Sequence, residues 1–210
     1  LEPLVAALQE FYSGLFPNVN TNPDVTPVVN AQHFARVESY VADAGARGAR
    51  VVMAGDWPSA EGASQRKMPL RLVINPDSES SISQNEIFGP ALVLRSFTDV
   101  AQAVQSINQG ERPLALYYFG SDETEQNWVL DNTLSGGVSI NDVVMHPALE
   151  DAPFGGVGAS GMGHYHGHEG FKTFSHAKST FIKQRYNAAR MIYPPYGKAI
   201  QKLVYKLFVR

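Results

Sequence analysis

Short apolar runs alternate with helical stretches along most of the chain, and this alternation limits the possible folds more than any other feature. The runs are rich in Val, Leu, Ile and Tyr and lie at residues 49–55, 69–76, 90–97, 114–120 and 137–146. Helical spacing follows at 98–110, where Thr98 or Asp99 can cap the helix and Gly110 can end it, and at 121–137. Strands joined by helices imply right-handed crossovers. The pattern therefore predicts an α/β fold with three layers, αβα, and a largely parallel sheet.

Helices are also predicted near both ends of the chain. Residues 2–16 carry apolar side chains at a helical period, and Asn30 can cap a second helix that runs to about Ala44. The segment 198–210 is amphipathic, with three lysines in an i, i+4 row opposite an apolar face. We expect this last helix to dock on its own protein, with binding to a membrane surface as the alternative.

The composition is that of an ordinary globular protein, and it excludes several kinds of chemistry. The 210 residues include no cysteine, which excludes disulfides, thiolate zinc sites and a cysteine nucleophile in this chain. No apolar run is long enough to span a bilayer, and the first residues lack the pattern of a signal peptide. We therefore expect a cytoplasmic protein.

The charges are unevenly distributed along the sequence. From Phe171 to Arg210 there are nine Lys or Arg residues and no acid, whereas the first 170 residues carry eight bases and twenty acids. A basic C-terminal arm beside an acidic body could meet nucleic acid, a membrane surface or an acidic partner subunit. Nucleic acid is the weakest of these alternatives because the sequence has no known nucleic-acid-binding motif beside the basic residues.

The glycine-rich segment 153–171 contains the spacing G-x-G-x-x-G at Gly156, Gly158 and Gly161. A dinucleotide-binding loop needs a strand that runs directly into the first glycine and an acid about 20 residues further on. Neither condition is met, because residues 147–155 intervene and Glu169 is the last acid of the chain. We therefore expect these glycines to allow close backbone approach or positive φ.

Three further patterns could indicate a functional site but also have purely structural interpretations. His164, His166 and His168 alternate, but no carboxylates follow at a metal-ligand spacing, so we expect loop histidines and no metal. Ser160 lacks the G-x-S-x-G setting of a hydrolase nucleophile. From periodicity alone, Gln84–Pro90 is a surface turn with Phe88 in the core.

Several motifs in order along nearly the whole chain resemble those of aldehyde dehydrogenases. They are "NEIFGPALVLRSF", "RPLALYYFGSD", "YPPYGK" and a long segment that includes "NDVVMH", "PFGGVGASGMG" and "GHYHG". Together they resemble the C-terminal part of that family, and in detail its class 3 and bacterial coniferyl aldehyde dehydrogenase branch. The resemblance implies oxidation of aromatic or aliphatic aldehydes, including coniferyl aldehyde, to carboxylic acids with NAD or NADP. In the family a cysteine thiolate attacks the aldehyde, hydride passes to the nicotinamide, and a glutamate activates the water that releases the acid.

The resemblance assigns the cofactor contacts of this chain to the motif E-I-F-G-P. Glu86 is expected to bind the hydroxyls of the nicotinamide ribose, since the two oxygens of a carboxylate suit a vicinal diol. Phe88 is expected to pack near the nicotinamide.

The resemblance assigns the substrate pocket to the glycine-rich segment. Phe154 of P-F-G-G is expected to line its wall, and Tyr165 and His166 resemble a Tyr-His pair that supports the catalytic centre in the class 3 branch. His146 is a weaker candidate for the same pocket.

The resemblance also predicts how the chain is divided. Residues 1–175 are expected to form part of a catalytic domain, and residues 176–210 an oligomerisation arm strand and a C-terminal amphipathic helix. The arm strand is expected to join a neighbouring subunit's sheet in a homodimer, and the helix resembles the family's cap over the substrate entrance. The family's cysteine and general-base glutamate have no counterpart here, so we expect a truncated portion that is inactive alone. Two alternatives remain: a non-catalytic assembly module, whose exposed sheet edges would favour association, and a nucleotide-binding protein that relies on the glycine loop.

Overall fold

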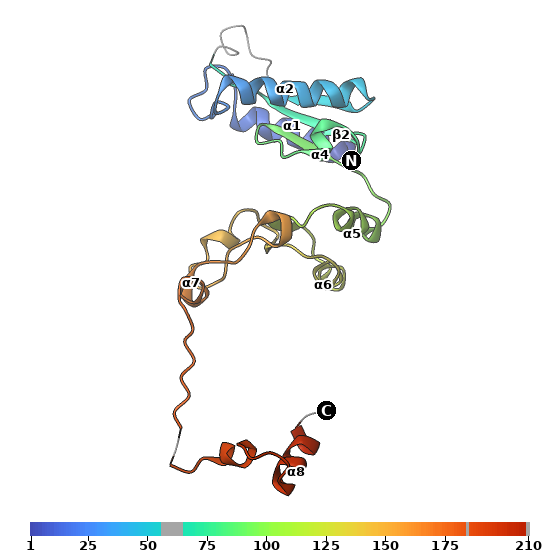
Figure 1. Cartoon of the computed structure of the whole chain (residues 1–210). Helices are drawn as coiled ribbons and strands as arrows, with labels where there is room; N and C mark the ends of the chain where they lie inside the picture. Colours follow the sequence, from blue (N-terminus) through green and yellow to red (C-terminus); the bar gives the residue numbers. More distant parts are fainter. Residues whose placement is uncertain (56–64, 184, 209–210) are drawn as a thin grey trace. The chain divides into compact units, whose positions relative to one another are not determined.

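The computed structural model describes residues 1–55, 65–183 and 185–208. The chain forms two compact units, Leu1–Gln105 and Ser106–Arg210, which divide within helix α5 (Val100–Gln109). Each unit has its own small sheet, as Figure 1 shows for the first unit at β2. The mixture of helices and strands confirms the predicted α/β class.

Unit 1 combines helices and a three-stranded sheet in the order predicted from the sequence. Its elements are α1 (Glu2–Leu15), α2 (Ala31–Ala46), β1 (Arg50–Ala54), β2 (Leu70–Ile74), α4 (Ser81–Gln84) and β3 (Ala91–Leu94). The side chain of Asn30 accepts a hydrogen bond from the His33 amide (2.8 Å), which confirms it as the cap of α2. The short helix α4 was not predicted.

The core of unit 1 lies on both faces of β2, because side chains alternate across a strand. Leu72 and Ile74 pack against Val5 of α1. Val73, between them, packs on the opposite side with Ala44 of α2 and Ile82 of α4. The two long helices therefore cover opposite faces of the sheet, as predicted for a three-layer arrangement (Figure 1).

The sheets differ from the single, largely parallel sheet that the sequence predicts. The described residues form two separate sheets, with strand orders β1-β2-β3 and β4-β5. The pairs β2–β3 and β4–β5 are parallel, whereas β1 and β2 are antiparallel. Two parallel strands must be joined by a crossover connection. The connection between β2 and β3 contains the short helix α4.

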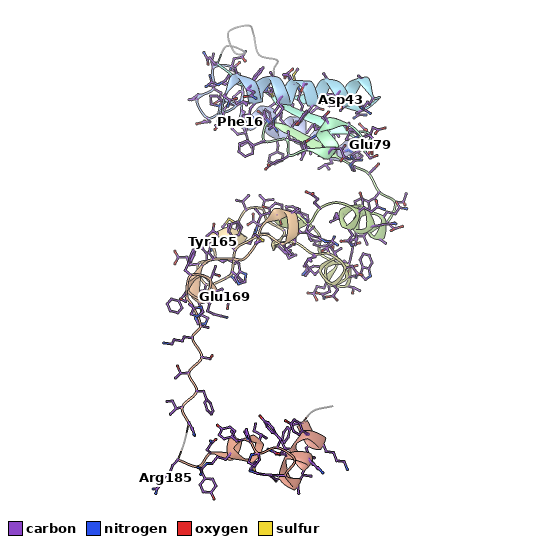
Figure 2. The ribbon with its side chains drawn as sticks, in the orientation of Figure 1. Phe16, Asp43, Glu79, Tyr165, Glu169 and Arg185 are labelled. Atoms are coloured by element: carbon purple, nitrogen blue, oxygen red, sulfur yellow. The ribbon has the colours of Figure 1, made fainter. Side chains whose placement is uncertain are left out.

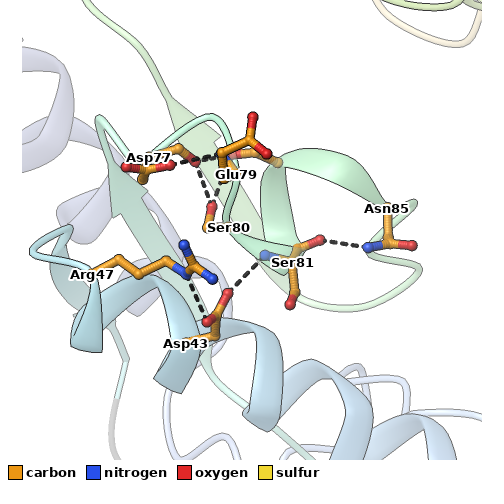
Figure 3. A network of polar contacts seen from close by, with 8 residues as sticks. Asp43, Arg47, Asp77, Glu79, Ser80, Ser81 and Asn85 are labelled. Carbon is orange, nitrogen blue, oxygen red and sulfur yellow. Dashed lines mark hydrogen bonds and ion pairs between the residues drawn. The ribbon is translucent and has the colours of Figure 1, made fainter.

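A polar network fixes α4 against the end of α2 (Figure 3). The Asp43 carboxylate accepts a hydrogen bond from the Ser81 amide (2.7 Å) and one from Arg47 Nε (2.9 Å). On the other side of α4, the Asn85 side-chain amide donates to the Ser81 carbonyl (2.9 Å). The network therefore fixes the end of α4 at Asn85, where the following loop begins.

Unit 2 contains a two-stranded sheet followed by loops and short helices. Its elements are β4 (Ala115–Tyr118), α6 (Glu123–Asn132), β5 (Gly137–Ile140), η1 (His146–Ala148), η2 (Gly158–Ser160), α7 (Gly167–Thr173), η3 (Ala188–Ile192) and α8 (Ala199–Phe208). Asp122 caps α6 by accepting hydrogen bonds from the Thr124 and Glu125 amides (2.9 and 3.2 Å). The helix α6 forms the crossover between the parallel strands β4 and β5.

The strand predicted over 137–146 ends early, at Ile140. Asn141 and Val144 both have positive φ (55° and 60°), which an extended strand does not allow. Asn141 also exchanges two hydrogen bonds with the backbone of Gly120, each 2.9 Å long. These bonds turn the chain at the carboxyl ends of β4 and β5 and so place the following segment, 142–146, outside the sheet.

The predicted arm forms no strand in the residues described on either side of position 184. Residues 176–183 lie between α7 and η3 without helix or strand, and every one of them is exposed. A strand that completes a neighbour's sheet would find no partner within one chain, so pairing with a second subunit stays a prediction. The functional division into 1–175 and 176–210 also stays a prediction. The amphipathic helix predicted near the C-terminus is confirmed as α8; residues 209–210 lie outside the description.

In the described parts of the chain, we find no helix with both the length and the apolar character needed to cross a membrane.

The Asp43 network predicts a specific acid sensitivity of unit 1. The Ser81 amide, and next the Arg47 guanidinium, hold the pKa of Asp43 below its ordinary value of 3.8. A lowered pKa contributes stability above the ordinary value, and this stability is lost as the pH falls through the folded-state pKa. The variant Asp43→Asn should therefore show a smaller loss of stability between about pH 5 and about pH 3, measured by urea unfolding.

The matched control is Glu79→Gln, which removes one negative charge from the same region (Figure 3). This variant should keep the acid sensitivity of the unmodified chain. Equal acid sensitivity in Asp43→Asn and the unmodified chain would contradict the role of Asp43.

Candidate functional site

The loop at residues 85–90, called here the Glu86 loop, is held to α2 through its backbone. Arg36 donates hydrogen bonds to the carbonyl of Glu86 (3.1 Å) and to that of Ile87 (2.8 Å). The side chain of Ile87 packs into the clusters around Val37 and around Val73. These contacts direct Ile87 inward and leave the side chains of Glu86 and Phe88 exposed.

The structure corrects the simple prediction that Phe88 lies in the core. Phe88 is 66% exposed, and the half-buried Ile87 packs against the core instead. Phe88 also has φ of 47°, which is unusual for a bulky residue and indicates that the surrounding contacts impose the loop conformation. Among the described residues, the Glu86 carboxylate has neither an ion-pair partner nor a hydrogen-bond partner.

His33 also lies at this site, although the sequence did not indicate it. Its ring centroid is 6.3 Å from that of Phe88, and its Nδ1 is buried without a hydrogen-bond partner. His33 lies in the first turn of α2, more than fifty residues before the Glu86 loop, so no local sequence pattern links the two. Beside Phe88 is a mainly apolar pocket of ≈ 610 Å³, lined among others by Tyr12, Val28 and Met68.

The pocket residues predicted in unit 2 lie together in one aromatic cluster. Phe154 and Tyr165 form an antiparallel β-bridge with two hydrogen bonds of 2.9 Å, and their rings meet edge to face at 5.6 Å. The His166 ring stacks on Phe154 at 6.0 Å and meets Tyr165 at 4.5 Å. Tyr165, labelled in Figure 2, is 48% exposed, whereas Phe154 and His166 are half-buried.

His146 joins this cluster to the sheet. Its ring lies 5.8 Å from Phe154 and 5.9 Å from Tyr117 of β4, and its Nδ1 is 3.2 Å from the hydroxyl of Ser139 in β5. The Nε2 atom is buried without a hydrogen-bond partner. The structure thus places His146 behind Phe154, where its ring supports the cluster.

The glycine-rich segment has the close backbone packing predicted for it. A Cβ atom on Gly156 would overlap the carbonyl of Ser160, and Gly158 has φ of 62°. The third glycine, Gly161, follows the short 3₁₀ turn η2 and does not open an α-helix. A dinucleotide fingerprint needs a helix at that point, so this geometry does not match one. The Ser160 hydroxyl is bonded to the Val157 backbone, which gives it a local structural role.

The alternating histidines do not converge. His164 pairs with Glu169 (3.2 Å), which also binds Lys172 (2.9 Å) on α7. Lys172, and next His164, lower the pKa of Glu169. Within the ranges that the structure describes, we find no group of three or more His, Asp or Glu side chains that could hold a metal ion.

The predicted site residues therefore form two groups. Glu86 and Phe88 lie together on one loop of unit 1, whereas His146, Phe154, Tyr165 and His166 lie together in unit 2. Both groups stand on loops that follow or precede parallel strands, a common position for functional residues in α/β proteins.

Comparison with known proteins decides the family. A profile described as "Aldehyde dehydrogenase family" matches residues 1–180. The chain belongs to the aldehyde dehydrogenase family.

The aldehyde dehydrogenase relatives include bacterial and mammalian proteins. The chain is 50% identical, over its whole length, to a probable coniferyl aldehyde dehydrogenase of Pseudomonas aeruginosa, of which it covers 43%. It is 36% identical to a dimeric NADP-preferring aldehyde dehydrogenase of the rat, over 93% of this chain and 41% of the rat protein. The chain therefore spans less than half the length of these relatives.

Solved structures of aldehyde dehydrogenases are also similar to this chain in fold. A substrate-bound Staphylococcus aureus AldH matches 99% of this chain and 44% of its own, with 35% identity and a TM-score of 0.80. A Mycobacterium tuberculosis aldehyde dehydrogenase complexed with NAD+ matches 89% of this chain and 38% of its own, with 26% identity and a TM-score of 0.75.

The close packing at Gly156 predicts the effect of adding one methyl group there. Because the new Cβ would overlap the Ser160 carbonyl, Gly156→Ala should force the loop to move and destabilise unit 2 by about 2 kcal/mol. Gly110→Ala is the control, since its Cβ would meet the nearest atom at an ordinary 3.5 Å. Thermal and urea unfolding of the two variants measure the difference. Equal stabilities would contradict the packing described for Gly156.

Proposed function

We propose that this chain forms part of a subunit that oxidises aldehydes to carboxylic acids with NAD or NADP, corresponding to the C-terminal part of the enzyme. The observation that carries the proposal is the Glu86 loop, which packs Ile87 against the core and leaves Glu86 and Phe88 exposed. Such a loop offers an anion and an aromatic ring side by side. Family membership supports the assignment of both to the nicotinamide end of the cofactor.

The residues of the Glu86 loop fit a bound dinucleotide. The two oxygens of the Glu86 carboxylate can accept hydrogen bonds from both hydroxyls of a ribose, and this carboxylate is exposed. Phe88 offers an exposed ring against which a planar nicotinamide can pack. When bound, the cofactor supplies the acceptor for the hydride that leaves the substrate.

The cluster of unit 2 fits the wall of a pocket for an aldehyde, and coniferyl aldehyde is our proposed substrate. Phe154 would meet an aromatic substrate ring, while Tyr165 and His166 hold Phe154 from two sides. His146 supports Phe154 from the side of the sheet. A closely packed aromatic wall also excludes water from the reacting carbon.

The thiolate must come from polypeptide outside this sequence, because the sequence has no cysteine. A serine hydroxyl does not replace it readily, since a hydroxyl has no accessible anionic form near neutral pH. This chain would thus supply part of the binding surface and not the nucleophile.

A chimera tests this proposal. The chain replaces the matching 43% of the Pseudomonas aeruginosa relative, and NAD(P)H formation is followed with coniferyl aldehyde. We expect turnover. Glu86→Gln in the chimera should raise the KM for NAD(P) roughly tenfold, with little change in the KM for aldehyde, because it removes one charge-assisted contact. Phe154→Leu should instead raise the KM for coniferyl aldehyde about threefold to tenfold.

Glu79→Gln serves as the control for Glu86→Gln and should leave both constants unchanged. A chimera that folds and turns over normally with Glu86→Gln would exclude the proposed cofactor contact. A chimera that folds but shows no turnover would exclude the proposed activity.

We further propose that the arm joins a second copy of the subunit as a homodimer. The support is the segment 176–183, which belongs to no helix or strand of the structure. Two of its large apolar side chains are exposed, Phe181 by 90% and Ile182 by 73%. Large apolar side chains in an extended segment are suited to strand addition on another sheet. This role would also serve a non-catalytic assembly module.

Light scattering of the purified chain tests the homodimer. We expect the mass of a dimer at micromolar concentration, and a shift toward the monomer when Phe181 and Ile182 are both changed to Ser. The control is Phe171→Ser, which alters an exposed phenylalanine on α7, outside the arm. A monomer over a wide range of concentrations would contradict the proposal.

A further inference from the structure

Arg36 is the only side chain of α2 for which we find hydrogen bonds to the backbone of the Glu86 loop in the described part of the chain. Its Nη1 and Nη2 atoms bond to two successive carbonyls, those of Glu86 and Ile87, at 3.1 and 2.8 Å. Arg36 is far from these residues in sequence, so the two bonds are tertiary contacts. A planar guanidinium can bridge two acceptors in a fixed orientation, which a lysine ammonium cannot do.

The surroundings of Arg36 restrict where its guanidinium can point. The guanidinium carbon lies 5.3 Å from the ring centroid of Tyr40, one turn further along α2. This distance allows a cation–π contact. The Nε atom is buried without a hydrogen-bond partner, so the side chain keeps this position at the cost of one unsatisfied donor.

The loop meets α2 at two further places. Ile87 packs beside Val37, and a Cβ atom on Gly89 would lie 2.5 Å from Val37 Cγ2. Residue 88, between these two anchors, has a positive φ. Glu86 and Phe88 are therefore presented outward only while the backbone on both sides of them stays in place.

We propose that Arg36 is a positioning residue for cofactor binding. It fixes the backbone at residues 86 and 87, so that the Glu86 carboxylate and the Phe88 ring are preorganised toward the nicotinamide ribose. The proposal rests on the proposed cofactor role of Glu86, and Arg36 acts through the loop and not by contact with the cofactor. Preorganisation of this kind reduces the entropy lost when the ligand binds.

The test uses the whole chain with two substitutions of Arg36. Arg36→Met keeps much of the aliphatic stem and removes both hydrogen bonds, and Arg36→Lys keeps the charge but can bond to one carbonyl at a time. Backbone NMR order parameters of residues 86–89 are measured in each. We expect a decrease from about 0.85 to below about 0.6 in Arg36→Met and an intermediate value in Arg36→Lys.

The control is Arg50→Met, which removes an exposed ion pair with Glu2 on the other side of unit 1. It should leave the order parameters of residues 86–89 unchanged. Circular dichroism and the order parameters of β2 show that each variant is folded. Unchanged loop order in a folded Arg36→Met would overturn the proposal.

Saturation-transfer NMR with millimolar NAD+ separates this proposal from the function on which it rests. If both proposals hold, the transfer to the nicotinamide ribose falls in Arg36→Met and in Glu86→Gln, while loop order falls only in the former. A second outcome is that the loop loosens in Arg36→Met, while saturation transfer to the nicotinamide ribose is unaffected by Glu86→Gln. This outcome would support Arg36 as an anchor of the loop and reject the cofactor role of Glu86. A loosened loop with reduced transfer in Glu86→Gln but full transfer in Arg36→Met would overturn the positioning role.

Discussion

Burial of β2 on both faces is the constraint on which the rest of unit 1 depends. Leu72 and Ile74 on one face require α1, and Val73 on the other requires α2 and α4. Since α2 is fixed by this packing, its N-terminal half is fixed as well, and Arg36 and the buried Val37 can hold the Glu86 loop from there. A change in the pairing register of β2 by one residue would exchange its two faces and displace the loop.

Unit 2 positions its loop in a different way. Its sheet has two strands, and the contacts that hold the pocket cluster are mostly backbone contacts: the bridge between Phe154 and Tyr165, and the close approach of Gly156 to Ser160. Side chains then fill the remaining space, as His146 does behind Phe154. Both units thus fix a loop through its backbone and leave at least one aromatic side chain exposed, Phe88 in unit 1 and Tyr165 in unit 2. A rigid binding site needs such an arrangement.

Much of the secondary structure follows from local sequence, and the exceptions have tertiary causes. The helix cap at Asn30 and the apolar run at residues 69–76 are local signals, and both predictions are confirmed, the second as strand β2. The early end of β5 depends on bonds between Asn141 and Gly120, which no local pattern contains. The packing of Ile87, in place of Phe88, against the core likewise involves Arg36, which is distant in sequence. Motifs thus predict which residues to consider as site residues, whereas their orientation required the structure.

We propose that this chain supplies binding surfaces of an aldehyde dehydrogenase but no nucleophile. The most direct measurement is NAD(P)H formation by the purified chain alone, with NAD or NADP and with coniferyl and aliphatic aldehydes. We expect no rate above that of buffer, because the sequence contains no thiol. A rate that increases in proportion to the concentration of the chain would contradict it.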